Sequence, residues 1–531
     1  LPPNIVLQNP HLIGGLSYAV FKKLGKIMVM VDQDGDENYL PMLIPITGGF
    51  PEQAFNGFFA KKRCHLGEID QEKGTCIIAA ESREEGMVQT YLCHLDSGDV
   101  EEIYSSPYGG YPAARNDDFS KIVLVEGYMV GDTIAYLWEK GKDLKLIYGK
   151  PLSERKKDEE IKLPAFGGGF FTQDGKGLVI GNALFQDTYG LGYLPFDDPT
   201  SIKEVPVKGL VHTGFGEFEG LDKLDNGLFL LQYNIDGVSW VYEAEYDPQD
   251  QTMCAVHTLV GRGVFSEGVL EAIKYDQDTD RFAIAFSTAT SPTQIYSIEG
   301  KDRDRLIRHT NESILGVPEG LLSGGEDYSY TSFDGLRISA RLYMPSEELG
   351  FSGKRPVIYY LHGGPQGQER PDFSWFSMPL IQFLTLQGFA VFVPNVRGST
   401  GYGLSFTKHV DRDWGGKDRL DHVHAMTEVL PKDKRLDVTR TGVVGRSYGG
   451  YMTLTLAGRH PELWAGAVDM FGPYDLLTFM ERIPPTWKPY FYIALTSMII
   501  GAQFFLAGFL GELVSRSSSD RNNYQIDKTT F

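Results

Sequence analysis

The chain has 531 residues, a hydrophobic fraction of 42%, a charged fraction of 23% and a formal net charge of −20. This length predicts two to four domains, and the composition is that of a globular protein. The negative charge argues against nucleic acid as a partner, because phosphate binding requires clustered Lys and Arg.

The first 320 residues predict an all-β domain with an internal repeat. One Asp/Asn/Gly turn recurs and is followed each time by a β-rich run, at residues 70–74, 116–118, 173–177, 224–227 and 276–280. The interval of about fifty residues is typical of four-stranded propeller blades. We therefore expect a β-propeller of six to seven blades over residues 1–320, with a pair of β-sandwiches as the alternative.

Histidines and cysteines in this region lack metal-ligand spacing. We interpret six histidines as surface or hydrogen-bonded loop residues: His11, His65, His94, His212, His257 and His309. Four cysteines without a CxxC pair predict free thiols in a reducing compartment, with disulfides as the alternative: Cys64, Cys76, Cys93 and Cys254. We expect no metal and no cofactor.

The pattern changes after a Pro/Gly cluster at residues 315–325. Strand-like segments then alternate with helix-length segments; the strands are expected at 337–343, 357–361, 390–394, 442–445 and 466–471, and the helices at 378–387, 417–430 and 448–459. Such alternation predicts a largely parallel sheet covered on both faces. Residues 321–488 therefore predict an α/β-hydrolase domain, complete to about its sixth strand.

Two motifs in this domain indicate nucleophilic catalysis. The segment from Gly445 to Gly449 has the pattern G-x-S-x-G between a strand and a helix, which is the nucleophile elbow. Its glycines are expected to allow a sharp turn that pushes the Ser447 oxygen out of the sheet. The segment from His362 to Pro365 follows an earlier strand, and in serine hydrolases such a loop supplies an N–H of the oxyanion hole. An ordinary Gly-Pro turn is the alternative for the second motif.

Together the motifs resemble the prolyl oligopeptidase family of serine peptidases, in its acylaminoacyl-peptidase-like branch. The matching residues span roughly 327 to 473 and are His362–Pro365, Pro394–Gly403, Trp414, Asp418, Asp421 and Gly445–Met452. The resemblance implies that Ser447 is the nucleophile and that the backbone N–H groups of Gly364 and Tyr448 form the oxyanion hole. It also implies a peptide substrate, and a propeller that restricts access to short or unstructured peptides.

The chain departs from the family after Ser447. A serine needs a histidine base oriented by a carboxylate, and in α/β hydrolases both follow the serine in sequence. The last histidine is His460, interpreted as a surface residue one helix beyond the elbow. The nearest earlier histidines belong to the oxyanion loop or lie near the helix from Lys417: His362, His409, His422 and His424. We therefore expect a peptidase whose activity is impaired.

An uncharged apolar run occupies residues 489–511. Its 23 residues are enough to cross a bilayer, so residues 489–531 predict a transmembrane helix with a short tail. A buried helix of the hydrolase core is the alternative. The tail resembles the end of membrane-bound polyprenyl-phosphate sugar transferases at Gly501, Gln503, Gly508, Gly511, Glu512, Arg516 and Tyr524. If this resemblance is genuine, a truncated peptidase is joined to a foreign tail near residues 485–492. The sequence contains no recognisable glycosyltransferase catalytic domain.

Two classes of function follow. The first is a serine peptidase acting on short peptides or acyl-peptides through an acyl-enzyme, with a cytoplasmic catalytic region anchored at its C-terminus; an esterase is its nearest alternative. The second is a non-catalytic, membrane-attached propeller protein or a chimeric gene remnant.

Overall fold

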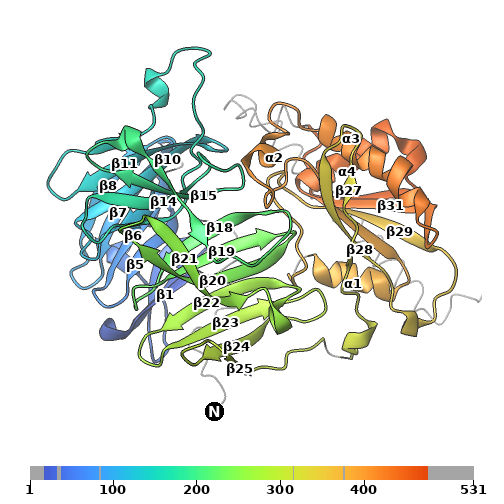
Figure 1. The fold of residues 1–531 in the computed structure, drawn as a ribbon, viewed down its shortest axis with the longest axis horizontal. Helices are drawn as coiled ribbons and strands as arrows, with labels where there is room; N and C mark the ends of the chain where they lie inside the picture. Colours follow the sequence, from blue (N-terminus) through green and yellow to red (C-terminus); the bar gives the residue numbers. More distant parts are fainter. Residues whose placement is uncertain (1–16, 33–37, 83–84, 315, 375–376, 476–531) are drawn as a thin grey trace, which may run out of the picture. The chain divides into compact units, whose positions relative to one another are not determined.

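The computed structural model describes residues 17–32, 38–82, 85–314, 316–374 and 377–475 (Figure 1). Residues up to Met470 belong to one compact unit, which contains both sheet systems discussed below.

Six separate sheets of mainly antiparallel strands make up the first part of the described chain. Five have four strands, and the fifth along the chain has five because β17 (Val207–Lys208) joins it in parallel to β21. Each sheet follows the previous one in sequence, as expected for propeller blades. The predicted propeller is confirmed, and the described residues form six blades.

The strands of the first three blades are β1 (Tyr18–Phe21), β2 (Lys26–Val31), β3 (Leu40–Pro45), β4 (Glu52–Gln53), β5 (Arg63–Asp70), β6 (Thr75–Ser82), β7 (Met87–His94), β8 (Val100–Ser106), β9 (Tyr111–Arg115), β10 (Lys121–Met129), β11 (Asp132–Glu139) and β12 (Lys145–Tyr148). Those of the last three, besides β17, are β13 (Gly169–Phe171), β14 (Gly177–Asn182), β15 (Gly190–Pro195), β16 (Lys203–Val205), β18 (Gly216–Lys223), β19 (Phe229–Ile235), β20 (Val238–Asp247), β21 (Thr252–Val260), β22 (Val269–Asp276), β23 (Arg281–Ser287), β24 (Gln294–Glu299) and β25 (Arg305–Arg308).

The recurring turn of the sequence has one structural role. In the second to sixth blades it connects the strands of the first antiparallel hairpin, as between β5 and β6, between β18 and β19 or between β22 and β23. In the second blade the carboxylate of Asp70 accepts hydrogen bonds from the N–H groups of Glu72 and Lys73, both at 3.0 Å. A side chain that satisfies its own turn explains why Asp and Asn recur there.

The second part of the described chain is built on a mixed sheet with the order β26-β28-β30-β29-β31-β32, and β27 also pairs with β28. Its strands are β26 (Glu326–Asp327), β27 (Tyr330–Thr331), β28 (Arg337–Tyr343), β29 (Arg355–Leu361), β30 (Ala390–Asn395), β31 (Leu436–Arg446) and β32 (Gly466–Met470). The four strands from β30 to β32 in this order are parallel, as the strand–helix alternation predicted.

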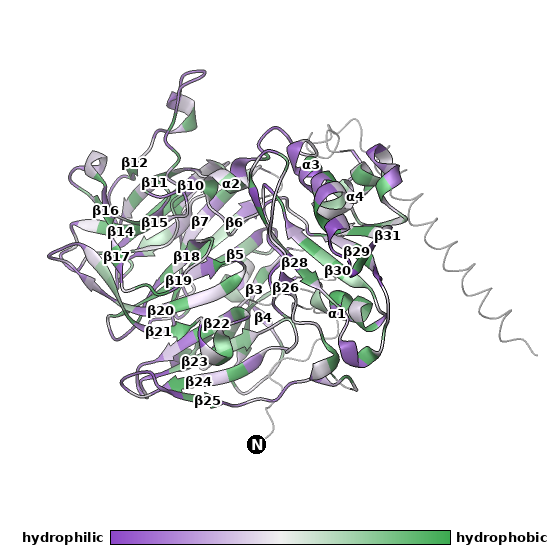
Figure 2. Ribbon diagram, turned by 45° about the vertical axis from the view of Figure 1, so that its right-hand side comes forward, coloured by the Kyte–Doolittle hydropathy of each residue, from purple (hydrophilic) through white to green (hydrophobic). Residues whose placement is uncertain are grey.

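Four α-helices accompany this sheet among the described residues: α1 (Met378–Leu386), α2 (Leu404–Lys408), α3 (Lys417–His424) and α4 (Tyr448–Arg459). Hydrophobic colours run along the central strands β29 and β30 (Figure 2). The first four residues of β30 are all buried, since a central strand of a parallel sheet is covered on both faces. This rigid centre carries the loops that form the site.

The predicted transmembrane helix at residues 489–511 and the tail that follows it lie outside the described residues. Within the described part, no helix is long and apolar enough to cross a membrane. The domain boundaries at residues 320 and 488 stay predictions.

Candidate active site

Ser447 stands between β31 and α4 and is exposed. Its φ of 52° and ψ of −121° are unusual for a residue with a side chain, and such strain at a strand-to-helix turn is the geometry of a nucleophile elbow. Its N–H donates to the carbonyl of Met470 at 3.0 Å, and its carbonyl accepts from the N–H of Tyr451 at 3.0 Å. Hydrogen bonds to β32 and to α4 therefore hold the turn.

The two glycines of the elbow allow close approach of backbone segments. Neither has a positive φ, so the left-handed residue of the turn is Ser447, and the glycines permit the sharp turn because they lack a Cβ. A Cβ on Gly445 would lie 2.3 Å from the carbonyl oxygen of Gly449. A Cβ on Gly449 would lie 2.3 Å from the carbonyl oxygen of Leu361. Only glycine lets the first turn of α4 pack this closely on β29 and β31.

The loop from His362 to Pro365 borders the serine. A Cβ on Gly363 would lie 3.1 Å from the Cβ of Ser447 and 3.7 Å from its Oγ. Gly364 is exposed and has a φ of 127°, a region that favours glycine. The structure thus brings the two predicted motifs into contact, although they lie about eighty residues apart in the chain.

His362 holds this loop in place through contacts of both of its ring nitrogens. Its Nδ1 lies 2.8 Å from the carbonyl oxygen of Gly363, and its Nε2 lies 3.0 Å from the hydroxyl of Ser399. Burial lowers the pKa of His362, which favours the neutral ring. A carbonyl oxygen can only accept, so Nδ1 carries the proton and donates to Gly363. The hydroxyl of Ser399 that lies beside Nε2 donates to the carbonyl of Val396 at 2.7 Å. His362 is therefore committed to its loop.

Tyr448 follows the serine, and its ring is buried against Trp414, with the ring centroids 5.2 Å apart. Its hydroxyl accepts from the N–H of Gly415 at 3.0 Å and donates to the carboxylate of Asp418. Burial raises the pKa of Asp418 to about 6. The family-like residues Trp414 and Asp418 thus anchor the residue whose N–H is predicted to stabilise an oxyanion.

A second buried network lies beside the first. The guanidinium of Arg397 donates to the carboxylate of Asp421 at 2.8 and 2.7 Å, and to that of Asp334 at 2.8 Å through two nitrogens. Ser332 also donates to Asp421. The hydrogen bonds from Arg397 lower the pKa of Asp334 to about 2. This network joins the end of β30 to α3 and to the turn between β27 and β28.

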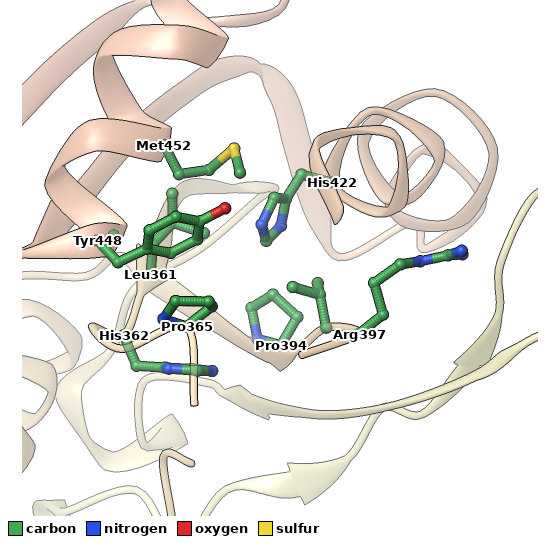
Figure 3. A pocket seen from close by; sticks show the side chains of 10 residues that line it. Leu361, His362, Pro365, Pro394, Arg397, His422, Tyr448 and Met452 are labelled. Carbon is green, nitrogen blue, oxygen red and sulfur yellow. The ribbon is translucent and has the colours of Figure 1, made fainter. Parts of the chain in front are cut away.

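A small cavity borders the loop from His362 to Pro365 (Figure 3). Its volume is about 20 Å³, and its lining includes His362, Arg397, His422 and Tyr448. A cavity of this size has room for one water molecule. It is too small for a peptide side chain, so it belongs to the support of the site rather than to substrate binding.

Two further histidines that the structure describes in the hydrolase part, His422 and His460, have partners other than Ser447. His422 is buried in α3, where its Nδ1 lies 3.1 Å from the hydroxyl of Tyr359 and burial lowers its pKa to about 3. His460 follows the last residue of α4 and contacts Arg419. A helix of 12 residues is about 18 Å long, so His460 lies far from Ser447, as predicted.

Two residues that support the site have no role predicted from the sequence. Ser399, from the family-matching segment Pro394–Gly403, contacts His362 directly. Glu217, on β18 of the propeller, accepts hydrogen bonds from the N–H groups of Gly401 and Gly403 in that same loop. Nothing in the sequence near Glu217 indicates this contact, because its partners are 184 and 186 residues away.

The propeller histidines have the partners expected of structural residues. The side chains of His65, His94, His257 and His309 are hydrogen-bonded to Glu81, Thr75, Glu243 and Ser297, and His212 to Tyr242; His11 lies outside the described residues. The four cysteines carry free thiols. Across the described ranges, no group of three His, Cys, Asp or Glu side chains is arranged to hold a metal ion.

Comparisons with known proteins agree with this geometry. The sequence profile of the prolyl oligopeptidase family matches residues 374–492. An uncharacterized peptidase of Bacillus subtilis, YuxL, is 31% identical over 190 residues, which are 36% of this chain and 28% of that protein. Dipeptidyl aminopeptidase BIII of Pseudoxanthomonas mexicana is 34% identical over 136 residues, which are 26% of this chain and 19% of that protein. The matched part is thus less than a third of either relative.

The fold is also that of solved peptidases. A puromycin-hydrolyzing peptidase of Mycobacterium tuberculosis superposes with a TM-score of 0.67 at 16% identity, over 92% of this chain and 75% of that one. At this identity the likeness concerns the fold. Residues 374–492 are thus similar in sequence to the prolyl oligopeptidase family, and the chain spans less than a third of the length of either named relative.

Proposed function

We propose that the protein is a serine peptidase that cleaves short peptides or acyl-peptides. The observation that carries this proposal is the exposed Ser447, held at a φ of 52° at the start of α4 with Gly363 of the HGGP loop against it. The peptidase relatives support the substrate class.

In the proposed reaction, the Oγ of Ser447 attacks the carbonyl carbon while a general base takes its proton. The N–H groups of Gly364 and Tyr448 stabilise the oxyanion, and collapse of the intermediate releases the amine and leaves an acyl-enzyme. Water then releases the acyl group. Three described histidines of the hydrolase part, His362, His422 and His460, have other partners. The prediction of impaired activity concerns this proton transfer and stays a prediction.

A fluorophosphonate probe tests the proposal, because it reacts with activated serines. We expect covalent labelling of the full chain that is lost in Ser447→Ala and kept in Ser266→Ala, which removes an exposed serine of the propeller. Peptide and ester substrates assayed side by side would then separate a peptidase from an esterase. Labelling that survives Ser447→Ala, or no labelling of the folded wild-type chain, would count against a serine hydrolase.

A further inference from the structure

Glu217 of the propeller grips the glycine-rich loop that follows β30. Its Oε1 accepts the N–H of Gly401 at 3.0 Å, and its Oε2 accepts the N–H of Gly403 at 2.7 Å. Hydrogen bonds to an ionised carboxylate are about twice as strong as neutral ones. The carboxylate is half-buried, and burial raises its pKa. One side chain thus fixes two alternate residues of a loop in the other sheet system.

The loop of residues 398–403 contains three glycines, so restraints from other parts of the protein matter for its conformation. Gly398, Gly401 and Gly403 have φ values of 97°, 95° and 100°, which other residues rarely adopt. Glycine reaches these angles freely, but for the same reason it loses the most conformational entropy when it is ordered. The hydrogen bonds from Glu217 add to two local ones, from the N–H of Gly398 to the carbonyl of Phe406 and from the N–H of Ser399 to the carbonyl of Val396, in restraining residues 398–403.

The other side of the same loop holds the oxyanion loop. The hydroxyl of Ser399 contacts Nε2 of His362 at 3.0 Å, and the N–H of Thr400 donates to the carbonyl of Gly367 at 3.0 Å. Ser399 is fully buried, so its contact is shielded from water. Hydrogen bonds thus connect Glu217 to residues 401 and 403 of this loop, and residues 399 and 400 of the same loop to both ends of residues 362–367.

We propose that Glu217 is a positioning residue for the oxyanion loop. The proposal rests on the proposed function in so far as Gly364 donates to an oxyanion. Glu217 does not touch the reacting atoms; it holds residues 398–403 in place, and these hold His362 and Gly367. Alignment of the Gly364 N–H with Ser447 then depends on a carboxylate of the propeller.

A second propeller carboxylate, that of Asp187, binds the hydrolase part at a neighbouring point. Asp187 accepts the N–H of Ser405 at 2.9 Å and its hydroxyl at 2.7 Å, at the start of α2. Both residues are exposed, and Ser405 follows the glycine-rich segment, although Asp187 also borders Gly403, where an added Cβ would lie 2.5 Å from its Oδ2. The side-chain hydrogen bonds of Asp187 end on Ser405, so its loss should loosen mainly the start of α2.

Hydrogen–deuterium exchange on the full chain tests the coupling without requiring activity. In Glu217→Gln, the side-chain amide keeps one acceptor and loses the other, so we expect several-fold faster exchange in peptides covering residues 396–406 and also 361–369. Glu245→Gln is the matched control, since it removes an exposed carboxylate on β20 of the same blade. Unchanged exchange at 361–369 in Glu217→Gln would overturn the proposal.

Phosphonylation kinetics test the consequence for Ser447. We expect Glu217→Gln to lower the rate constant of the covalent step several-fold with little change in the initial binding constant, because only alignment is affected. A merely structural role would reduce the fraction of reactive protein and leave that rate constant unchanged. Ser399→Ala should act through the same contacts, so the double variant should be no slower than the worse single variant. If the reductions in rate constant of the two single variants multiply in the double variant, Glu217 and Ser399 act independently, and the proposal is refuted. An unreactive wild-type chain would refute the proposed function, while exchange would still decide the positioning role.

Discussion

The hydroxyl of Tyr448 donates to the buried carboxylate of Asp418. This contact ties the residue after the nucleophile to α3, so the backbone N–H proposed for the oxyanion hole is positioned by its own side chain. On the opposite side of Ser447, His362 and Ser399 position the HGGP loop in a comparable way. Both proposed oxyanion donors are thus held by buried polar contacts rather than by packing alone.

Removal of that hydroxyl should be costly. In Tyr448→Phe the carboxylate of Asp418 loses its side-chain donor while it remains buried, so we expect a loss of about 1–3 kcal/mol in the free energy of unfolding. Labelling of Ser447 should also slow. Urea denaturation measures the first effect. Tyr451→Phe, one turn along α4 with its ring against Tyr448, is the control and should change stability by less than about 1 kcal/mol. Equal effects of the two changes would contradict the anchoring role.

The carboxyl group of Asp418 should make stability depend on pH. Burial raises its pKa to about 6 in the folded protein, whereas an unfolded Asp titrates near 3.9. Between these values the folded state binds the proton and the unfolded state does not, so stability falls as pH rises through this window. We expect a loss of about 2 kcal/mol between pH 4 and 7 relative to Asp418→Asn, taken as the difference between two unfolding curves. A difference that does not vary with pH would contradict this environment.

The steric role of the elbow glycines can be tested within one helix. In Gly449→Ala the new methyl group would meet backbone oxygens of Leu361 and His362 at 2.3 and 2.6 Å, so we expect a loss of more than about 3 kcal/mol. Gly458 lies near the end of α4, and a Cβ added there would have no neighbour within 4 Å. Gly458→Ala should therefore stabilise by about 0.5–1 kcal/mol, because Ala is the better helix former. Thermal unfolding of both variants would show opposite shifts.

Local patterns predicted those parts of the molecule that local chemistry determines. The recurring Asp-containing turns marked the first hairpin of five blades, since each turn is satisfied by its own side chains. The G-x-S-x-G pattern placed Ser447 correctly, because a strand and a helix flank it. Gly449 has a further role that no local pattern indicated, since the backbone that it approaches most closely belongs to another strand. The role of Glu217 had no local signal at all, because its partners are loop N–H groups far along the chain.

Two arginines of the hydrolase part should differ sharply in their contribution to stability. Arg397 is buried between Asp421 and Asp334, so Arg397→Ala leaves a buried carboxylate without its partner and should cost about 3–5 kcal/mol. Arg435 pairs with Glu326 and Asp433 near the surface, with about half of its side chain exposed (47%). Because water screens that pair, Arg435→Ala should cost at most about 1 kcal/mol. Comparable losses in urea denaturation would mean that burial does not govern these ion pairs.

The cysteines should separate into two classes of reactivity. Cys64, Cys76 and Cys93 lie in the core shared by the first two blades, and burial raises the pKa of the Cys64 thiol to about 12. The contact with Cys76, together with burial, also raises the pKa of Cys93. All three side chains are buried and therefore shielded from the reagent, so these thiols should resist iodoacetamide in the folded protein. Cys254, on β21, is partly exposed and should react first.

Mass spectrometry after alkylation of the native and the urea-unfolded protein checks this order. We expect one modified cysteine in the native protein, at Cys254, and four after unfolding. Cys254→Ser should then give a native protein that takes up no label, with its unfolding curve little changed because the site is partly exposed. Rapid labelling of Cys76 or Cys93 in the native state would mean that the first two blades open far more often than their buried core implies.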